Sequence, residues 1–111
     1  MYMKNLRRIS LQETINKLST YLGFCIKSNS ILFGVDNIVK SKKKLDLIIF
    51  CSTTNEKTIR SLQNKDCLMV KFKDLLLSDL VKRDNVKVVA IKNNNLAKAI
   101  LSFDELLIKL N

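Results

Sequence analysis

Hydrophobic positions along the chain change repeatedly between helical spacing and short apolar runs, which predicts alternating helices and strands. A first helix is expected to begin at Ser10, because the sequence SLQE forms a capping box with Glu13 at the third helical position. The apolar residues of this predicted helix share one face: Leu11, Ile15, Leu18, Leu22 and Ile26.

Shorter elements follow this helix. Residues 30–33 are predicted to form a strand, and Gly34 opens a short helix that ends at Lys40. The apolar run LDLIIFC at residues 45–51 is typical of a strand buried on both faces, so this strand should be central. The later expected elements are a helix from the capping box TTNE (Thr53 to Glu56) to about Gln63, a strand at 67–72, a helix at 73–82, a strand at 85–91, and a helix from the run Asn93, Asn94 and Asn95 to about Leu110.

The resulting order is αβαβαβαβα in a single domain over residues 1–111, with a short N-terminal extension at residues 1–10. Helices interleaved with strands must cover the faces of the sheet, so the predicted fold class is α/β, a three-layer α/β/α sandwich with a four-stranded mixed sheet. Its core is expected to include Leu47, Ile49, Val70, Val89 and Ile91.

The length and hydrophobic content of the chain agree with this small fold. With 111 residues and 47% hydrophobic content, the chain suits one compact domain with a small core. Its longest apolar runs are far shorter than the roughly 20 residues of a membrane span. The basic N-terminal sequence MYMKNLRRIS is followed by polar residues and not by the apolar core of a secretion signal. The expected form is a cytoplasmic monomer without membrane attachment.

The three cysteines are Cys25, Cys51 and Cys67, and no two of them form a C-x-x-C pair. Each has apolar neighbours, which is typical of a buried thiol in a reducing compartment. A metal or redox role would need closely spaced thiolates or a histidine partner, and the chain contains no histidine. We therefore expect no metal and no cofactor.

The sequence lacks the usual signs of an enzyme. Without histidine, a histidine-dependent triad is excluded, and Gly23 and Gly34 are too sparse for a phosphate-binding glycine-rich loop. Acidic residues such as Asp104 and Glu105 fall on predicted helix faces or loop ends, where solvated charges are common. We expect a protein without catalytic activity, and a small hydrolase or transferase is the third alternative.

The formal net charge of +10 is concentrated in the first half of the chain. Residues 1–60 contain 11 basic and 4 acidic residues, a net charge of +7, whereas residues 61–111 contain 9 and 6, a net charge of +3. Such a charge attracts polyanions, of which nucleic acid is the commonest in a cytoplasm. The abundance of Lys, Ile and Asn is also what an AT-rich genome produces regardless of function, so the positions of the charges have to decide.

The segment YLGFCIKSNSILFGVDNIVKS, residues 21–41, resembles part of the L-seven-Ae / L-thirty-e ribosomal protein family. In that family, a helix with a basic end is followed by a strand, a glycine and a helix with the pattern G-x-N-E-x-x-K, which binds the sheared G·A pairs of an RNA kink-turn. The matching residues in GVDNIVK are Gly34, Asp36, Asn37 and Lys40. The resemblance covers about residues 15–103 and is greatest to short bacterial members of the YlxQ type.

The resemblance implies an RNA-binding site at one edge of the fold. Its implied residues are Gly34, Asp36, Asn37, Lys40, Lys27, Lys42, Lys43, Lys44, Val86 and Lys87. The acid and the amide have changed places relative to the family pattern, yet both groups can still bond to exposed base edges. The lysines, together with the N–H groups at the helix start, would supply phosphate contacts.

Each of these residues also has a purely structural interpretation. Asp36 can complement the dipole at a helix start, and Asn37 can act as a local cap. Lys27 can serve a helix C-terminus, and the lysine run can be a solvated loop. Val86 can be an ordinary strand residue that faces the core.

The sequence therefore predicts a non-enzymatic protein that binds structured RNA, similar to a kink-turn and including ribosomal RNA, in or near the ribosome. The alternative is a protein-interaction module of the same fold that has lost kink-turn binding, which the altered GVDN sequence permits.

Overall fold

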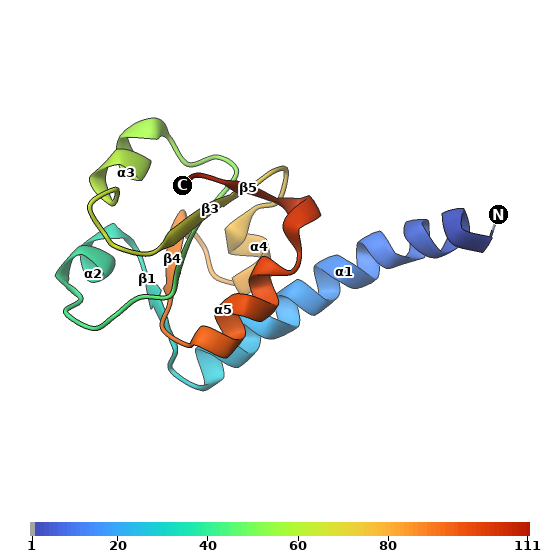
Figure 1. Cartoon of the computed structure of the whole chain (residues 1–111), viewed down its shortest axis with the longest axis horizontal. Coiled ribbons are helices and arrows are strands. Elements are labelled where there is room, and N and C mark those ends of the chain that lie inside the picture. The colour runs from blue at the N-terminus through green and yellow to red at the C-terminus, as the bar shows by residue number, and fades with distance from the viewer. Residues whose placement is uncertain (1) are drawn as a thin grey trace.

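A mixed β-sheet lies at the centre of the protein (Figure 1). The computed structural model describes the backbone of residues 2–111 and the side chains of residues 12–111. The strands occur in the order β1-β4-β2-β3-β5 across the sheet. Strand β2 is parallel to β3, whereas β1 with β4, β2 with β4, and β3 with β5 are antiparallel. Their bounds are β1 Ile31–Phe33, β2 Leu47–Phe50, β3 Leu68–Phe72, β4 Val88–Ile91 and β5 Leu107–Lys109.

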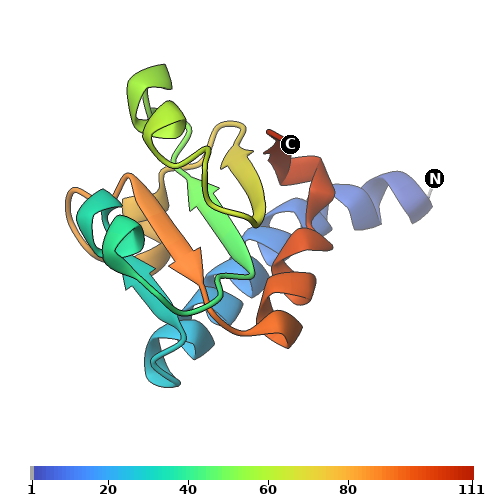
Figure 2. The ribbon, with the colours of Figure 1, turned by 60° about the vertical axis from the view of Figure 1, so that its left-hand side comes forward.

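Helices cover both faces of this sheet (Figure 2). Their bounds are α1 Tyr2–Lys27, α2 Val35–Lys40, α3 Glu56–Ser61, α4 Leu77–Val81, α5 Asn94–Leu101 and the 3-10 helix η1 Asp104–Leu106. Helices α1, α4 and α5 pack on one face, and α2 and α3 pack on the other. The prediction of an α/β fold with a mixed sheet is thus confirmed. No helix in the described part of the chain is both long and apolar enough to cross a membrane.

Strand β2 is buried on both faces, as its apolar run predicts. Leu47 and Ile49 contribute to the core beneath α1, α4 and α5, whereas Ile48 and Phe50 contribute to the core beneath α2 and α3. All four side chains are fully buried. The five core residues named from the sequence all belong to the first of these cores: Leu47, Ile49, Val70, Val89 and Ile91.

The sheet has five strands, so the prediction of four strands is wrong. The helix expected to reach about Leu110 ends at Leu101, and β5 then pairs with the outer edge of β3. The side chain of Asn111 completes this edge, because it accepts a hydrogen bond from the Met69 N–H at 3.0 Å and donates one to the Cys67 carbonyl at 2.9 Å. Pairing satisfies backbone groups of β3 that a helix at this position would leave unbonded.

Three predicted helix starts are also wrong. The helix predicted at residues 73–82 begins only at Leu77. Helix α1 begins at Tyr2 and not at Ser10, so Ser10 is not an N-cap and residues 2–10 are not a separate extension. Residues 2–9 include good helix formers and no Gly or Pro, so helix propensity favours continuation through the capping signal. The predicted position of Leu11 on the apolar helix face concerns a side chain outside the described residues. Met1 also lies outside them. Helix α3 begins after Asn55, whose side chain accepts from the Thr58 N–H at 2.9 Å.

A buried charge in the central strand should prevent folding. Ile49 is fully buried, so Ile49→Asp would place an unpaired carboxylate in the core at a cost of several kcal/mol. We expect this variant to lose cooperative thermal unfolding monitored by circular dichroism. Ile108→Asp is the matched control, because Ile108 is 45% exposed on the edge strand β5. A folded Ile49→Asp protein with a cooperative transition would contradict the assignment of β2 as the central strand.

Candidate nucleic-acid interface

The turn between β1 and α2 depends on Gly34. Its φ angle is +86°, a conformation that residues with a Cβ adopt only with strain. Its N–H donates to the Val88 carbonyl at 3.1 Å, and its own carbonyl accepts from the Ile38 N–H at 3.2 Å. The first bond continues the pairing of β1 with β4, and the second begins α2. Gly34 therefore joins α2 to the edge of the sheet beside the start of β4.

The loop from Lys82 to Lys87 connects α4 to β4 on the other side of this turn. Lys82 and Asn85 both adopt left-handed backbone conformations, with φ angles of 56° and 57°. The loop is held by Ser78, whose hydroxyl accepts from the Val86 N–H at 2.9 Å. Because β4 pairs with β1, this loop lies next to Gly34 although the two segments are about 50 residues apart in sequence.

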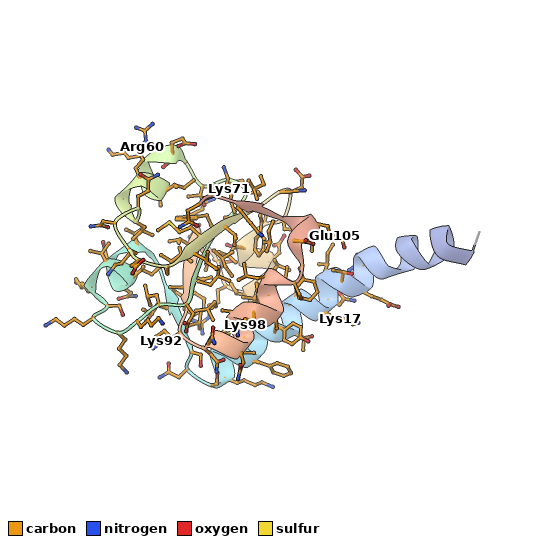
Figure 3. All side chains as sticks on the ribbon, in the orientation of Figure 1. Lys17, Arg60, Lys71, Lys92, Lys98 and Glu105 are labelled. Carbon is orange, nitrogen blue, oxygen red and sulfur yellow. The ribbon has the colours of Figure 1, made fainter. Side chains whose placement is uncertain are left out.

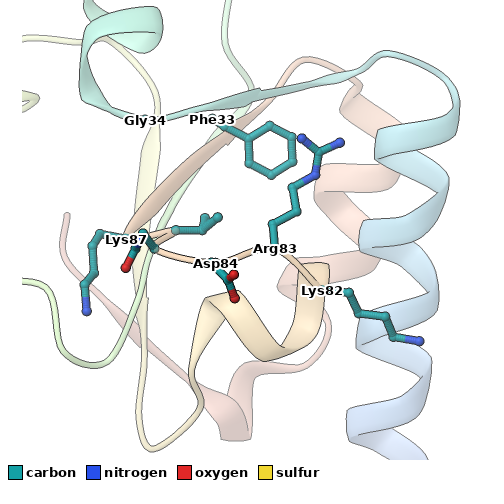
Figure 4. A pocket seen from close by; sticks show the side chains of 8 residues that line it. Phe33, Gly34, Lys82, Arg83, Asp84 and Lys87 are labelled. Atoms are coloured by element: carbon teal, nitrogen blue, oxygen red, sulfur yellow. The ribbon is translucent and has the colours of Figure 1, made fainter.

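A basic cleft of about 590 Å³ lies between this loop and the end of β1 (Figure 4). The guanidinium of Arg83 lies over the Phe33 ring, with 4.3 Å between its central carbon and the ring centroid. The cleft has three basic residues and one acidic residue, a local net charge of +2. The lining residues are Phe33, Gly34, Lys82, Arg83, Asp84, Asn85, Val86 and Lys87. It thus combines cationic groups with a flat aromatic and guanidinium surface.

A second basic hollow, of about 360 Å³, lies at the far end of α2. Four lysines and no acidic residue line it, and Lys92, which follows β4, is one of them (Figure 3). The lining residues are Leu32, Asn37, Lys40, Ser41, Lys42, Lys43 and Lys92. Leu32 packs against the core beneath α2, whereas its neighbour Phe33 packs against the opposite core. The two hollows therefore flank the edge strand β1.

Helix α2 presents Asp36, Asn37 and Lys40 to solvent. The Asn37 side-chain amide donates to the Phe33 carbonyl at 2.8 Å, which is a local bond but not a cap, because a cap accepts from a backbone N–H at the helix start. This bond leaves the Asn37 side-chain oxygen available as an acceptor. Asp36 lies in the first turn of α2, where a carboxylate complements the helix dipole. Both residues are positioned locally and remain accessible to a ligand.

The other predicted lysines line neighbouring hollows. Lys42 and Lys43 line the hollow that contains Asn37 and Lys40, and they also line an adjoining hollow that contains Lys44. Lys27, at the end of α1, lies in a groove against α4 and shares that groove with Lys82. Asn37 and Lys40 thus line one hollow, whereas Gly34 lines the basic cleft and Lys27 lines the groove against α4.

Val86 and Lys87 differ in exposure. Val86 is 8% exposed and belongs to the core, which agrees with its interpretation as an ordinary core residue. Lys87 is exposed, and its ammonium donates to the Thr53 hydroxyl at 2.8 Å. Of this predicted pair, Lys87 is therefore the residue that a ligand can reach.

The residues of the two hollows that sequence reasoning missed include an aromatic residue and three basic residues: Phe33, Lys82, Arg83 and Lys92. The adjacent cations in VKRDN were a usable signal, because they precede a strand start and stand outside any apolar periodicity. Nothing local connects Phe33 with Arg83, since their contact requires the pairing of β1 with β4.

No protein-family model matches the chain, and no curated protein matches it significantly. What the arrangement can do follows from its chemistry: lysine and arginine side chains can neutralise phosphates, and an arginine–aromatic pair can stack on a base.

The cysteines lie apart from the two hollows. Cys25, on α1, is fully buried, and burial raises its pKa from the ordinary 9.0 to about 11, against a smaller opposing effect of a backbone hydrogen bond. Burial also raises the pKa of Cys67, with a contribution from Asp66. Burial alone would raise the pKa of Cys51, but hydrogen bonds with Thr53 and Leu77 and the charge of Lys87 together lower it.

The raised pKa of Cys25 predicts a loss of stability at high pH. The folded pKa lies above the unfolded one, so the stabilisation is complete below about pH 9 and is lost as the pH rises through about 11. We expect the free energy of unfolding to fall by roughly 1 to 3 kcal/mol more in the wild type than in Cys25→Ala between these limits. Chemical denaturation of both proteins across this range measures the difference, and parallel pH dependences would contradict the burial effect.

Proposed function

We propose that this protein binds structured RNA through the two basic hollows that flank β1 and α2. The observation that carries the proposal is that Lys82, Arg83 and Lys87 line a cleft beside the turn at Gly34, near a second hollow with four lysines. A net charge of +10 adds long-range attraction for a polyanion. The proposed partners are RNAs with a kink-turn or a similar distortion, including ribosomal RNA, and the proposed setting is a cytoplasmic ribonucleoprotein.

Phosphate contacts would come mainly from the lysines. An ammonium group is a point charge that binds phosphate without sequence preference, so the seven basic side chains of the two hollows would position the RNA. Each phosphate contact makes affinity fall with salt by about 0.7 to 0.9 log units per log unit of salt. Four such contacts would lower affinity about 50- to 150-fold between about 50 and 200 mM salt.

Base contacts would come from Arg83 in the cleft and from Asp36 and Asn37 on α2. The outer face of the Arg83 guanidinium can stack on an unpaired base while its inner face rests on Phe33. Asp36 and the side-chain oxygen of Asn37 can accept hydrogen bonds from exposed base edges. Such contacts require bases that are unstacked or displaced, because the deep groove of a regular RNA helix is closed to side chains. This requirement favours a distorted helix over a regular one.

A distant relationship to the L-seven-Ae / L-thirty-e family forms part of the proposal. Its support is the sequence GVDNIVK, in which Gly34 ends an edge strand and opens a helix, together with the position of the α4–β4 loop beside that glycine. On this basis α2 would face the RNA. The exchange of acid and amide at Asp36 and Asn37 would change which base edges are preferred.

A protein-interaction module is the second candidate, and the apolar surface at the opposite edge of the sheet favours it. Leu68 and Ile108 are 50% and 45% exposed on β3 and β5. If this surface and not the basic hollows carries the function, folded RNA should bind weakly and without preference for a kink-turn.

Lysine substitutions should weaken binding to all RNAs alike. In Lys42→Gln/Lys43→Gln, two phosphate contacts are lost, so the slope of log affinity against log salt should become shallower by about 1.4 to 1.8. Lys73→Gln/Lys109→Gln is the control of equal charge, because both residues are exposed at the β3–β5 edge. The measurement is titration of a kink-turn hairpin and a regular hairpin of equal length at two salt concentrations. Equal slopes for both double variants would contradict the assigned surface.

Substitutions on α2 should change the preference between the two RNAs. Asp36→Ala and Asn37→Ala should each cost roughly 1 to 3 kcal/mol of affinity for the kink-turn hairpin, by analogy with base contacts in duplexes, and much less for the regular hairpin. Asn37→Ala should also lower the melting temperature, since it removes the bond to the Phe33 carbonyl. If both residues serve only the start of α2, stability will fall while the preference between the two RNAs stays unchanged.

A further inference from the structure

We infer that a groove between α1 and α4 binds an RNA strand that continues beyond the basic cleft. This inference rests on the proposed RNA-binding function and extends its interface to a groove of which the sequence analysis named only Lys27. The groove has a volume of about 320 Å³. Its lining residues are Ser19, Thr20, Gly23, Ile26, Lys27, Leu80, Val81 and Lys82.

The groove adjoins the basic cleft at Lys82, which lines both. Figure 4 shows the Lys82 side chain directed away from Arg83 and toward α1. Lys27 lies in the same groove, on α1. A strand that leaves the cleft along Lys82 would therefore meet a second ammonium group within the groove, which makes the groove complementary to a phosphate backbone.

Gly23 keeps this groove open. It lies inside α1, where glycine is among the least favourable residues. A Cβ at this position would meet no atom within 4 Å, so close packing does not require glycine. The Ser19 hydroxyl, one turn earlier, already holds α1 against α4 through a 2.9 Å bond to the Leu80 carbonyl. We therefore attribute the glycine at position 23 to the groove, which a side chain at this position would partly fill.

Lys82 provides a second sign that stability is not the only requirement here. As the C-cap of α4 it has a left-handed conformation, with φ 56° and ψ 43°, which favours glycine at a helix end. A lysine is therefore strained at the position where the cleft and the groove meet. Its ammonium group contributes a positive charge there that glycine would not.

An RNA strand fits the groove better than an apolar peptide does. The apolar side chains Ile26, Leu80 and Val81 can contact ribose and base faces, while the two lysines pair with phosphates. The groove contains no acidic residue to repel a phosphate backbone. RNA in the neighbouring cleft would also supply the strand without a further partner.

The test compares a kink-turn hairpin with the same hairpin carrying uridine extensions at both ends. Each extension has about six nucleotides, within the range of about 4 to 16 nucleotides that one OB fold binds. The proteins are the wild type, Gly23→Ala, Gly23→Gln and Gly23→Glu. We expect the extensions to raise wild-type affinity. The side chain in Gly23→Glu blocks the groove and repels phosphate. The affinity of this variant for the extended hairpin should therefore be about two- to fivefold lower than that of the wild type, while its affinity for the unextended hairpin should equal the wild-type value.

Gly23→Gln and Gly23→Ala separate the steric effect of the new side chain from the effect of its charge. Gly23→Gln should lose part of the gain through steric blocking, while Gly23→Ala should keep most of it and melt at a higher temperature. An extension gain that survives in Gly23→Glu, or no gain in the wild type, would overturn the inference while the hairpin still binds. If the wild type binds neither RNA, the proposed function fails, and the inference fails with it.

Discussion

The pairing of β4 with its two neighbours determines the rest of the structure. Strand β4 lies between β1 and β2, is antiparallel to both, and is buried on both faces. Its register with β1 is continued by the bond from the Gly34 N–H to the Val88 carbonyl. That bond fixes the start of α2 next to the loop that enters β4. Both basic hollows depend on it, because one begins at this loop and the other at the opposite end of α2.

Local sequence signals predicted the parts of the fold that depend on local energetics. The apolar run around Ile49 identified a strand buried on both faces, and the asparagine run supplied the α5 N-cap, since the Asn93 side chain accepts from the Leu96 N–H at 3.0 Å. The segment that forms β5 could not be assigned in this way, because its apolar pattern also suits a helix. Its strand state depends on pairing with β3, which is distant in sequence.

The candidate interface also contains residues that local sequence identifies and residues whose position depends on long-range pairing. The segment from Gly34 to Lys40 could be identified from the order strand, glycine and helix, which is local. Arg83 and Lys82 could not be placed beside it, since their position follows from the β1–β4 register and from a left-handed turn after α4. Two residues near this interface also conflict with local conformational preferences. Lys82 has a left-handed backbone conformation, and Gly23 lies inside a helix. Conflicts of this kind are expected where a surface has a function besides stability.

The central claim is that one edge of the sheet, around β1, α2 and the α4–β4 loop, contacts RNA. Lysine acetylation followed by mass spectrometry, with and without a bound kink-turn hairpin, tests it most directly. The account predicts that RNA protects Lys40, Lys82 and Lys87 from acetylation while Lys73 and Lys109, at the opposite edge, react as in the free protein. Equal protection of all five exposed lysines, or protection confined to the opposite edge, would contradict it.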